Sequence, residues 1–540
     1  MLATLQHSLF AQAIVTVFVV CFCTRILTSQ WFHSVRYRKG HNVTPPTAPY
    51  WIPGIKHALS LAFDGKAFMA KCFHYTYNNL LTFDRNKYGD GSPFFIDGAG
   101  QKMLIILDPD HIKGVFRASK EMDPNPFIHE RILGALMGSP PSAVQYYRSG
   151  DHNLDYIQTS HIRQHTTGSN LGLLDKRIFD MMKKTVGESL SSPGEWTEIP
   201  DLFAFVTHHV TYAIATTLLG SELVSSYPEL MADLWTHIEA TDGFFMGLPR
   251  FAIPKAYAAR DRLLASIRAW TTKSEELRNQ DKVDKTWDPV AGSGLLQERE
   301  KLYSEMPAHD EYARSAQTLG LLYGGTSLTV PTTFWYLFET LRTPDLHTRV
   351  LSEIKDHADP TTASYSIMQL TSRPLLQSLH AETTRLYSSN LTVREVTAPV
   401  YAFDDKYSIP KGTSVFIPTK WVSMFVPGWA RTRAQALARP LTTFWPERFL
   451  VYDADKKARF SDVGLAGSWV SFGGGEHKCP GRHFARNIAI VTLTVLMGEF
   501  ELEMRDVEGA SRFDPDHTKQ AFGTLKPKGK VEARIRRRVQ

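Results

Sequence analysis

The chain has 540 residues, of which 43% are hydrophobic and 21% charged, a balance typical of a globular protein rather than a disordered one. At this length it can bury one large core or about two or three ordinary ones, which is enough for an enzyme with an enclosed pocket. The formal net charge of +6 is a mild basic excess, and the sequence lacks the interleaved basic and aromatic residues that single-stranded nucleic acid needs. We therefore expect no nucleic-acid partner.

The N-terminal segment Ser8–Leu27 is apolar and carries no charge before Arg25. A helix needs about 20 mostly apolar residues to cross a bilayer core. Basic residues follow this run and none precedes it, so the positive-inside rule places the N-terminus in the lumen and the rest in the cytosol. A cleaved signal peptide is the alternative, but this segment lacks the charged n-region and the small-residue cleavage site that a signal peptide has. We expect residues 1–28 to be a membrane anchor.

Residues 29–54 combine basic side chains with four prolines, which stiffen the chain, so this segment is predicted to be a hinge. Residues 55–540 would then form the catalytic domain. Of the four cysteines, Cys21 and Cys23 lie in the anchor. Cys72 and Cys479 are too few for a disulfide framework in a body of this length.

The body is predicted to be mostly helical, with long helical patterns over Leu202–Leu219, Ala256–Arg278 and Ala313–Arg342. Short β segments are predicted at Lys102–Leu107, Thr392–Val400, Thr413–Pro418 and Val531–Arg537. The sequence has neither a G-x-G-x-x-G strand-to-helix unit nor a P-loop. A redox enzyme of this kind would take its electrons from another protein.

One cysteine lies in a dense motif, F-x-x-G-x-H-x-C-x-G, made by Phe472, Gly475, His477, Cys479 and Gly481. Glycines let the backbone approach a flat cofactor closely and turn its amides toward a sulfur. Such amides and the N-terminus of the following helix favour the thiolate. The pattern is typical of an axial thiolate ligand for haem iron, and a buried structural cysteine in a glycine-rich turn is the alternative.

With this motif the chain resembles the cytochrome P450 superfamily of haem-thiolate monooxygenases. The resemblance runs from Pro45 to the basic segment Arg534–Arg538. It implies a mainly α fold with a small β part, preceded by one transmembrane helix. It also implies haem b as the cofactor, with Cys479 as the iron ligand.

A second motif, "ETTR", places Glu382 and Arg385 three residues apart, on one face of a helix. Alone, this spacing is common and usually marks a surface ion pair. The resemblance implies that the two pair with Arg448 of "FWPERF" and hold the loop that carries Cys479.

The resemblance also implies groups for the two haem propionates. Arg394 lies nine residues beyond Arg385, at one propionate position, and His477 occupies the other, where the family more often has Arg. Where the family usually has a Trp and an Arg, the segment Ser160–His165 has other residues, and an exposed helical face is an equal interpretation. The candidates there are His161, Arg163 and His165.

The helix that crosses the haem in this family should read [A/G]-G-x-[D/E]-T-T, and this chain has "GGTSLT" at Gly324–Thr329. Ser327 stands at the acid position and Leu328 at the oxygen-side threonine, so proton delivery would pass to Ser327, Thr329, water or the substrate. Pro331 lacks an N–H, frees the carbonyl of Ser327 and should kink the helix. The segment that follows is most similar to the branch with cholesterol 7α-hydroxylase and prostacyclin synthase, which includes isomerases.

Further positions are assigned by the resemblance to the pocket wall or to the membrane, and ordinary core is the alternative for each. The wall candidates are Ser388, Ser389, Asn390, Leu391, Phe522 to Leu525 and Thr326 to Thr329. The segment Gly243–Phe251 falls where the family has a loop that dips into the bilayer.

We predict a monooxygenase of the endoplasmic reticulum membrane, single-pass with a cytosolic catalytic domain. It would receive electrons from NADPH-cytochrome reductase and oxidise a sterol, terpenoid or other lipophilic metabolite, in fungal secondary metabolite biosynthesis. Two alternatives stay open: a haem-thiolate isomerase or dehydratase that needs no reductase, and a non-catalytic haem- or sterol-binding membrane protein.

Overall fold

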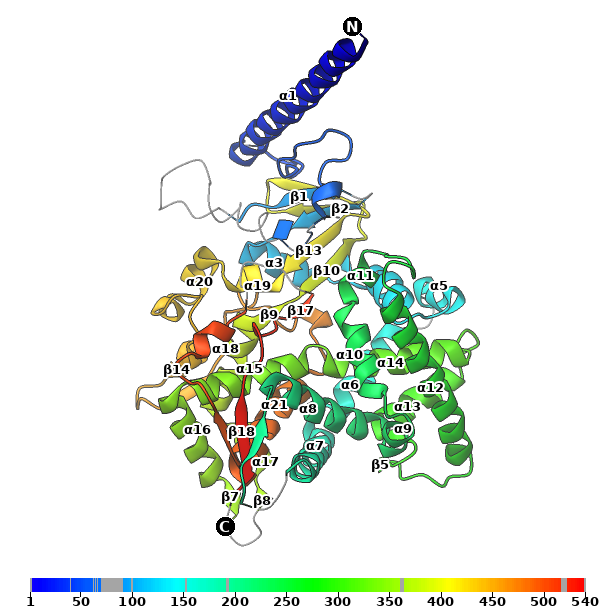
Figure 1. The fold of residues 1–540 in the computed structure, drawn as a ribbon, viewed down its shortest axis with the longest axis vertical. Coiled ribbons are helices and arrows are strands. Elements are labelled where there is room, and N and C mark those ends of the chain that lie inside the picture. The colour runs from blue at the N-terminus through cyan, green and yellow to red at the C-terminus, as the bar shows by residue number, and fades with distance from the viewer. Residues whose placement is uncertain are drawn as a thin grey trace.

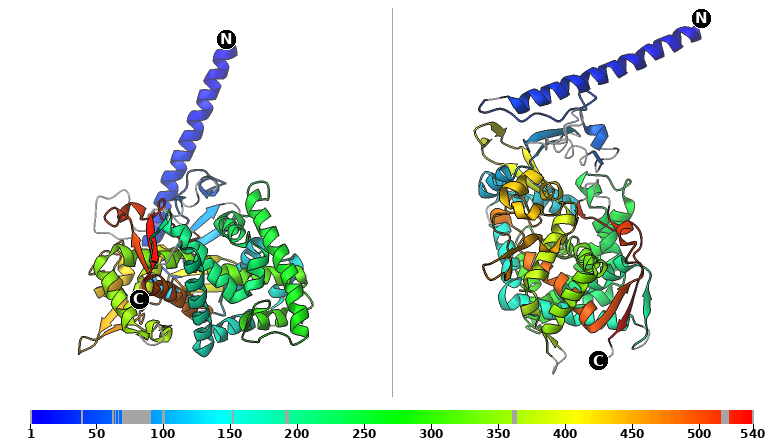
Figure 2. Two further views of the ribbon diagram at one scale, coloured as in Figure 1. Left: turned by 60° about the horizontal axis from the view of Figure 1, so that its bottom comes forward. Right: turned by 90° about the vertical axis from the view of Figure 1, so that its left-hand side faces the viewer.

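The computed structural model describes residues 2–38, 40–61, 63, 65, 67–68, 91–98, 101–150, 153–190, 194–359, 364–515 and 522–538. Cys72 lies outside the described residues. The described chain is mostly helical with a small β part, which confirms the predicted fold class (Figure 1). Helix α1 projects from one end of the molecule and the C-terminus lies at the opposite end (Figures 1 and 2).

The helices of the body vary from one turn to seven. The longer ones are α3 (Pro109–Arg117), α5 (Pro141–Ser149), α6 (Leu154–His165), α7 (Gly168–Glu188), α8 (Leu202–Leu219), α10 (Leu230–Glu239), α12 (Pro254–Asn279), α13 (Gly294–Ser304), α14 (Glu311–Thr326), α15 (Thr329–Arg342), α16 (Pro344–Asp356), α18 (Pro374–Tyr387) and α21 (Arg482–Thr494). The shorter ones are α4 (Asn125–Phe127), α9 (Ser221–Ser226), α11 (Thr241–Phe245), α17 (Ile367–Leu370), α19 (Thr419–Ser423) and α20 (Val426–Thr432), and η1 (Ile128–Leu136) is a π-helix.

The main sheet has five strands in the order β1-β2-β13-β10-β3. Its strands are β1 (Phe94–Gly98), β2 (Gln101–Ile105), β13 (Ser414–Pro418), β10 (Leu391–Val396) and β3 (Met122–Asp123). A second sheet pairs β16 (Phe500–Met504), β18 (Ala533–Arg537) and β4 (Thr197–Ile199), and β17 (Gly523–Thr524) pairs with β9 (Ser388–Ser389). The predicted helical and β segments are confirmed, with ends shifted by a few residues. The long pattern over Ala313–Arg342 divides into α14 and α15.

Helix α1 (Leu2–Tyr37) extends beyond the predicted end of the anchor at residue 28. Its stretch Phe10–Arg36 is long and apolar enough to cross a membrane, with a mean hydropathy of 2.1, and none of its apolar window is buried. The far end docks on the body, because Phe32 is buried and packs edge-on against Phe94 of β1 at 6.3 Å. Lys406 Nζ also donates to the carbonyl of Arg36 at 2.6 Å.

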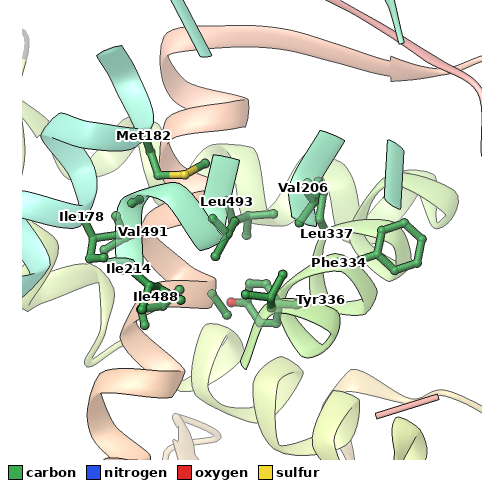
Figure 3. Close-up of a cluster of buried hydrophobic side chains, with 14 of the residues drawn as sticks. Ile178, Met182, Val206, Ile214, Phe334, Tyr336, Leu337, Ile488, Val491 and Leu493 are labelled. Carbon is green, nitrogen blue, oxygen red and sulfur yellow. The ribbon is translucent and has the colours of Figure 1, made fainter. Parts of the chain in front are cut away.

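The core lies between helices α7, α8, α15 and α21, which interlock through branched apolar side chains (Figure 3). Val206 and Ile214 of α8 lie near Leu337 of α15 and Ile488 of α21, and all four are buried. Helix α8 is also apolar enough to span a membrane, but 67% of it is buried inside the body. A helix that is apolar on every side belongs in such a core.

The helix predicted to kink at Pro331 is interrupted at Ser327 and Leu328, about one turn before the proline. Helix α14 ends at Thr326 and α15 begins at Thr329, with Leu328 between them at φ −100° and ψ −36°. The carbonyl of Leu328 accepts from Thr332 N at 3.2 Å and from Thr524 Oγ1 at 3.3 Å. The C-terminal strand β17 therefore holds the break in place.

We predict that two truncations of α1 will separate anchoring from docking. Removing residues 2–28 should release the protein from the membrane pellet without lowering its thermal unfolding midpoint, because Phe32 and its contact with Phe94 remain. Removing residues 2–37 should also lower the free energy of unfolding by about 3 to 5 kcal/mol, the usual loss for a deleted buried phenylalanine.

Fractionation and thermal unfolding of both truncated proteins decide this. Equal stability of the two would mean that the docked end of α1 contributes nothing. Protein lacking residues 2–28 that stays in the pellet would reveal a second membrane contact, for which Phe251, 86% exposed, is the candidate.

Candidate active site

The motif around Cys479 forms a tight loop between α3 and α21. The amide of Cys479 donates to the carbonyl of Phe472 at 2.9 Å, which closes the loop. A Cβ added at Gly474 would lie 2.2 Å from the Phe116 ring, and one at Gly475 would lie 2.1 Å from the Phe116 carbonyl oxygen. Gly475 also has φ +66°, a conformation that favours glycine. Only glycine fits these two positions, because the end of α3 presses on the loop.

Cys479 opens onto a cavity of about 860 Å³. Its side chain is exposed, and the exposed surface faces this cavity. Burial raises the pKa of the thiol above its ordinary value, and hydrogen bonds from the amides of Gly481 and Arg482 offset only part of that rise. Helix α21 begins at Arg482, so its positive N-terminal end adds to this effect. The loop thus presents a sulfur to the cavity with amides directed at it.

Glu382, Arg385 and Arg448 meet in a buried cluster. The Glu382 carboxylate accepts from Arg385 Nε at 2.6 Å, from Arg448 Nε at 3.0 Å and from the amide of Trp445 at 2.9 Å. All three charged side chains are fully buried. The sequence alone left open a surface ion pair, and the structure shows a buried network that joins α18 to the segment ahead of the Cys479 loop.

Both groups predicted for the propionates, Arg394 and His477, line the same cavity. One of the three candidates from the Ser160–His165 segment lines it too. Arg394 of β10 is buried, forms no ion pair with a described residue, and its one hydrogen bond is to the carbonyl of Val393. Burial lowers the pKa of Arg394 to about 10. His477 lines the cavity too, and burial, with the charge of Arg394, lowers its pKa. Arg163 is the third.

The other two candidates of the Ser160–His165 segment do not line the cavity as the structure describes it. His165 Nε2 lies 3.0 Å from Glu298 Oε2 on α13. His161 has a buried Nδ1 that makes no hydrogen bond with a described residue. The tertiary structure thus singles out Arg163 from three residues that sequence could not rank.

The break between α14 and α15 lies within Gly324–Thr329, the segment predicted to cross the haem. Some residues of this segment line the cavity and others do not. Leu328 and Thr329 line the cavity, and the Thr329 hydroxyl makes no hydrogen bond with a described residue. Ser327 is not among the lining residues, and its hydroxyl bonds instead to Tyr323. The Tyr323 hydroxyl in turn lies 2.7 Å from Thr241 Oγ1. Thr329 therefore faces the cavity, whereas Ser327 does not line it.

Only some of the predicted wall positions line the cavity. Ser388, Asn390 and Leu391 line the cavity, while Ser389, Thr326 and the segment Phe522 to Leu525 are not among its described lining residues. Lining residues that sequence reasoning missed include His380, Gln317 and Arg299. Each is an ordinary helical residue in the sequence, so no local signal marks it.

The residues present fit a haem group. The cavity joins an accessible sulfur to the buried cation of Arg394, which has no carboxylate partner among the described residues, and haem brings iron together with two carboxylates. Its walls are also largely apolar, which suits a flat porphyrin and a lipophilic substrate.

Comparison with known proteins agrees with this chemistry. The sequence model of the cytochrome P450 family matches residues 271–533. The chain is 29% identical to cytochrome P450 monooxygenase fsoE of Humicola fuscoatra, over 92% of this chain and 88% of that protein. It is 29% identical to cytochrome P450 monooxygenase efuG of Hormonema carpetanum, over 95% and 94%. It is 26% identical to cholesterol 7-alpha-monooxygenase of Cricetulus griseus, over 53% and 55%.

The site and the matches together define a haem-thiolate enzyme, and the chain belongs to the cytochrome P450 family. It is a monooxygenase for lipophilic substrates, and it carries haem with a cysteine thiolate ligand and depends on a redox partner. The resemblance to the cholesterol 7α-hydroxylase branch is confirmed. The roles of single residues stay predictions.

We predict that Glu382→Gln lowers the free energy of unfolding by about 3 to 5 kcal/mol, because two buried arginines lose their counter-charge. Denaturant unfolding of the haem-loaded protein measures this. Glu198→Gln is the matched control, since Glu198 pairs with Arg505 at the surface. The control should lose no more than about 1 kcal/mol. Similar losses in the two variants would contradict a structural role for the buried cluster.

Proposed function

We propose that Cys479 is the axial iron ligand of a membrane-anchored monooxygenase. The observation that carries this is the sulfur of Cys479, which opens onto the cavity from a glycine loop with amides directed at it. Residues 1–28 would be the anchor, 29–54 the hinge and 55–540 the catalytic domain. The net reaction is RH + O2 + NADPH + H+ → ROH + NADP+ + H2O, and the haem, when bound, supplies the oxygen-activating iron.

Residue roles follow from charge and position. Arg394 would hold one propionate and His477 the other, and Arg163, which lines the same cavity, would be a further contact. The Glu382–Arg385–Arg448 cluster would keep the ligand loop rigid, since its hydrogen bonds reach the backbone before the loop. None of these residues is assigned a step in the chemistry.

The setting is proposed to be the endoplasmic reticulum membrane, with a single span and a cytosolic catalytic domain. The apolar window of α1 and the basic residues after it support this arrangement. A sterol, terpenoid or similar metabolite could then enter from the bilayer. The relatives from Humicola fuscoatra and Hormonema carpetanum favour a role in fungal secondary metabolism.

Electrons would come from NADPH-cytochrome reductase at the thiolate side. Lys478 and Arg482 flank the ligand loop there, and complementary charge commonly steers such partners. Arg486, one turn further along α21, is half-buried and donates to Asn487 Oδ1 at 3.2 Å. Lys478 and Arg482 are therefore the better candidates for the contact.

Thr329 is the residue proposed to assist proton delivery. Leu328 has no polar atom, and Ser327 bonds away from the cavity to Tyr323. The Thr329 hydroxyl faces the cavity without a described partner, so it is available to water or to a substrate hydroxyl.

We predict that Cys479→Ser abolishes the thiolate-type carbon monoxide band of the reduced protein. A serine oxygen cannot supply the sulfur ligation on which the band depends. Cys72→Ser is the control and should keep the band. Loss of the band in Cys72→Ser with retention in Cys479→Ser would overturn the assignment. A wild-type protein without the band would favour a non-catalytic binding protein.

For Thr329→Val we expect less product per NADPH consumed and more peroxide, with the haem spectrum unchanged. The physical reason is the loss of the cavity hydroxyl that would orient a proton donor. Thr333→Val is the matched control, because the Thr333 hydroxyl donates to the carbonyl of Thr329 at 2.8 Å and does not line the cavity. Product, NADPH and peroxide are measured together.

Unchanged coupling in Thr329→Val, with full NADPH dependence, would exclude a relay through Thr329. Turnover without NADPH would instead support an isomerase or dehydratase. The two outcomes are separated by the NADPH measurement alone.

A further inference from the structure

Arg299 is a buried cation at the end of the cavity formed by α6, α13 and the first half of α14. Its side chain is 5% exposed and lines the cavity. Its guanidinium carbon lies 5.4 Å from the centre of the Tyr303 ring, and Nη1 makes no hydrogen bond with any described residue. Arg299 also forms no ion pair within 4.0 Å in the described part of the chain.

The carboxylates nearest along these elements are already engaged. Glu298 pairs with His165 at 3.0 Å, and Glu300 pairs with Arg314 at 3.2 Å and accepts from Thr318 at 2.7 Å. On α6, Asp155 pairs with His129 at 2.9 Å. None of them neutralises Arg299 by direct contact.

The polar side chains around Arg299 bond to one another. The Tyr147 hydroxyl accepts from the amides of Gln158 and Gln317 and lies 3.2 Å from His309 Nε2. Burial lowers the pKa of His309 to about 4, so its ring is neutral and can accept from Tyr147. Nη1 of Arg299, the Tyr303 hydroxyl and His309 Nδ1 make no hydrogen bond with a described residue, and Arg299 is the one of these three that carries a charge without a counter-charge.

A buried cation without a partner is unfavourable, because it has lost its hydration and gained no counter-charge. A guanidinium matches a carboxylate especially well, since its planar fork can donate two parallel hydrogen bonds. We propose that Arg299 binds a carboxylate inside the cavity. This inference rests on the proposed function, because the cavity is taken to hold haem and substrate.

Two sources offer that carboxylate: the second haem propionate, and an acidic group on the substrate. Thr159 of α6 lines the cavity together with Arg299 of α13, so a propionate bound there would lie between these two helices. A substrate acid would instead enter along Gly320 and Gly324 of α14, which also line the cavity and carry no side chain.

The test compares wild type, Arg299→Met and Arg299→Lys as haem-loaded, full-length proteins. Arg177→Met is the matched control, since the Arg177 guanidinium stacks on Trp287 at 3.6 Å and does not line the cavity. The first measurement is the propionate-bending band in resonance Raman spectra, together with the rate of haem release to an excess of a haem-binding protein. The second is the affinity of dodecanoate and of methyl dodecanoate, read from the shift of the Soret band.

If the carboxylate is a propionate, Arg299→Met shifts the bending band and speeds haem release about tenfold or more, with Arg299→Lys between it and wild type. If the carboxylate belongs to the substrate, the band is unchanged and wild type prefers dodecanoate to its ester by about tenfold. Arg299→Met then loses that preference and Arg299→Lys keeps part of it. Arg177→Met should match wild type in both measurements.

An unchanged band and an unchanged acid-to-ester ratio in both Arg299 variants would overturn the proposal. If Arg299→Met fails to fold, Arg299→Lys still decides, because a planar fork and a point charge differ in both measurements. Failure of the proposed function is distinct, since it would appear as a missing thiolate-type carbon monoxide band in the wild type.

Discussion

We propose that the Cys479 loop depends on one interaction, the buried carboxylate of Glu382 with its donors. A carboxylate with no access to water must be satisfied by several donors, and here two arginines and a backbone amide supply them. Arg448 also donates to the carbonyls of Arg439, Pro440 and Thr443. These bonds organise a segment with little regular structure, which is followed by the short strands β14 (Leu450–Tyr452) and β15 (Ala458–Phe460) and then by the loop that carries Cys479.

The arginines of the cavity differ from those of the Glu382 cluster, because no carboxylate of the described residues pairs with them. Arg394 and Arg299 are also buried, yet neither forms an ion pair with a described residue. The Glu382 cluster is complete within the protein, so it stabilises the fold without a ligand. The two cavity cations are incomplete within the protein, so they favour the binding of acidic groups. The same side-chain chemistry thus serves rigidity in one place and recognition in the other.

The interrupted helix α14–α15 shows both arrangements: some of its polar groups are satisfied within the protein, and others are open to the cavity. Pro331 removes a hydrogen bond, and Thr524 of β17 supplies a donor to the neighbouring carbonyl of Leu328. The break turns Leu328 and Thr329 toward the cavity and Ser327 toward Tyr323. The polar side chain at the acid position of the family pattern therefore bonds within its own helix, to Tyr323. Leu328 makes this part of the cavity wall apolar, in keeping with a lipophilic substrate.

Sequence by itself determined the elements and the chemistry of the ligand loop. The apolar patterns predicted helix α8 to the residue, the β segments within a few residues, and a haem thiolate at Cys479, because helix period, strand period and a contiguous motif are all local properties. Only the tertiary structure decided that Phe116 enforces the glycines and that α1 continues to Tyr37. It also turned Ser327 away from the cavity and brought Arg299 into it. These facts depend on contacts between segments far apart in the chain, and no local pattern encodes which side chain faces which partner.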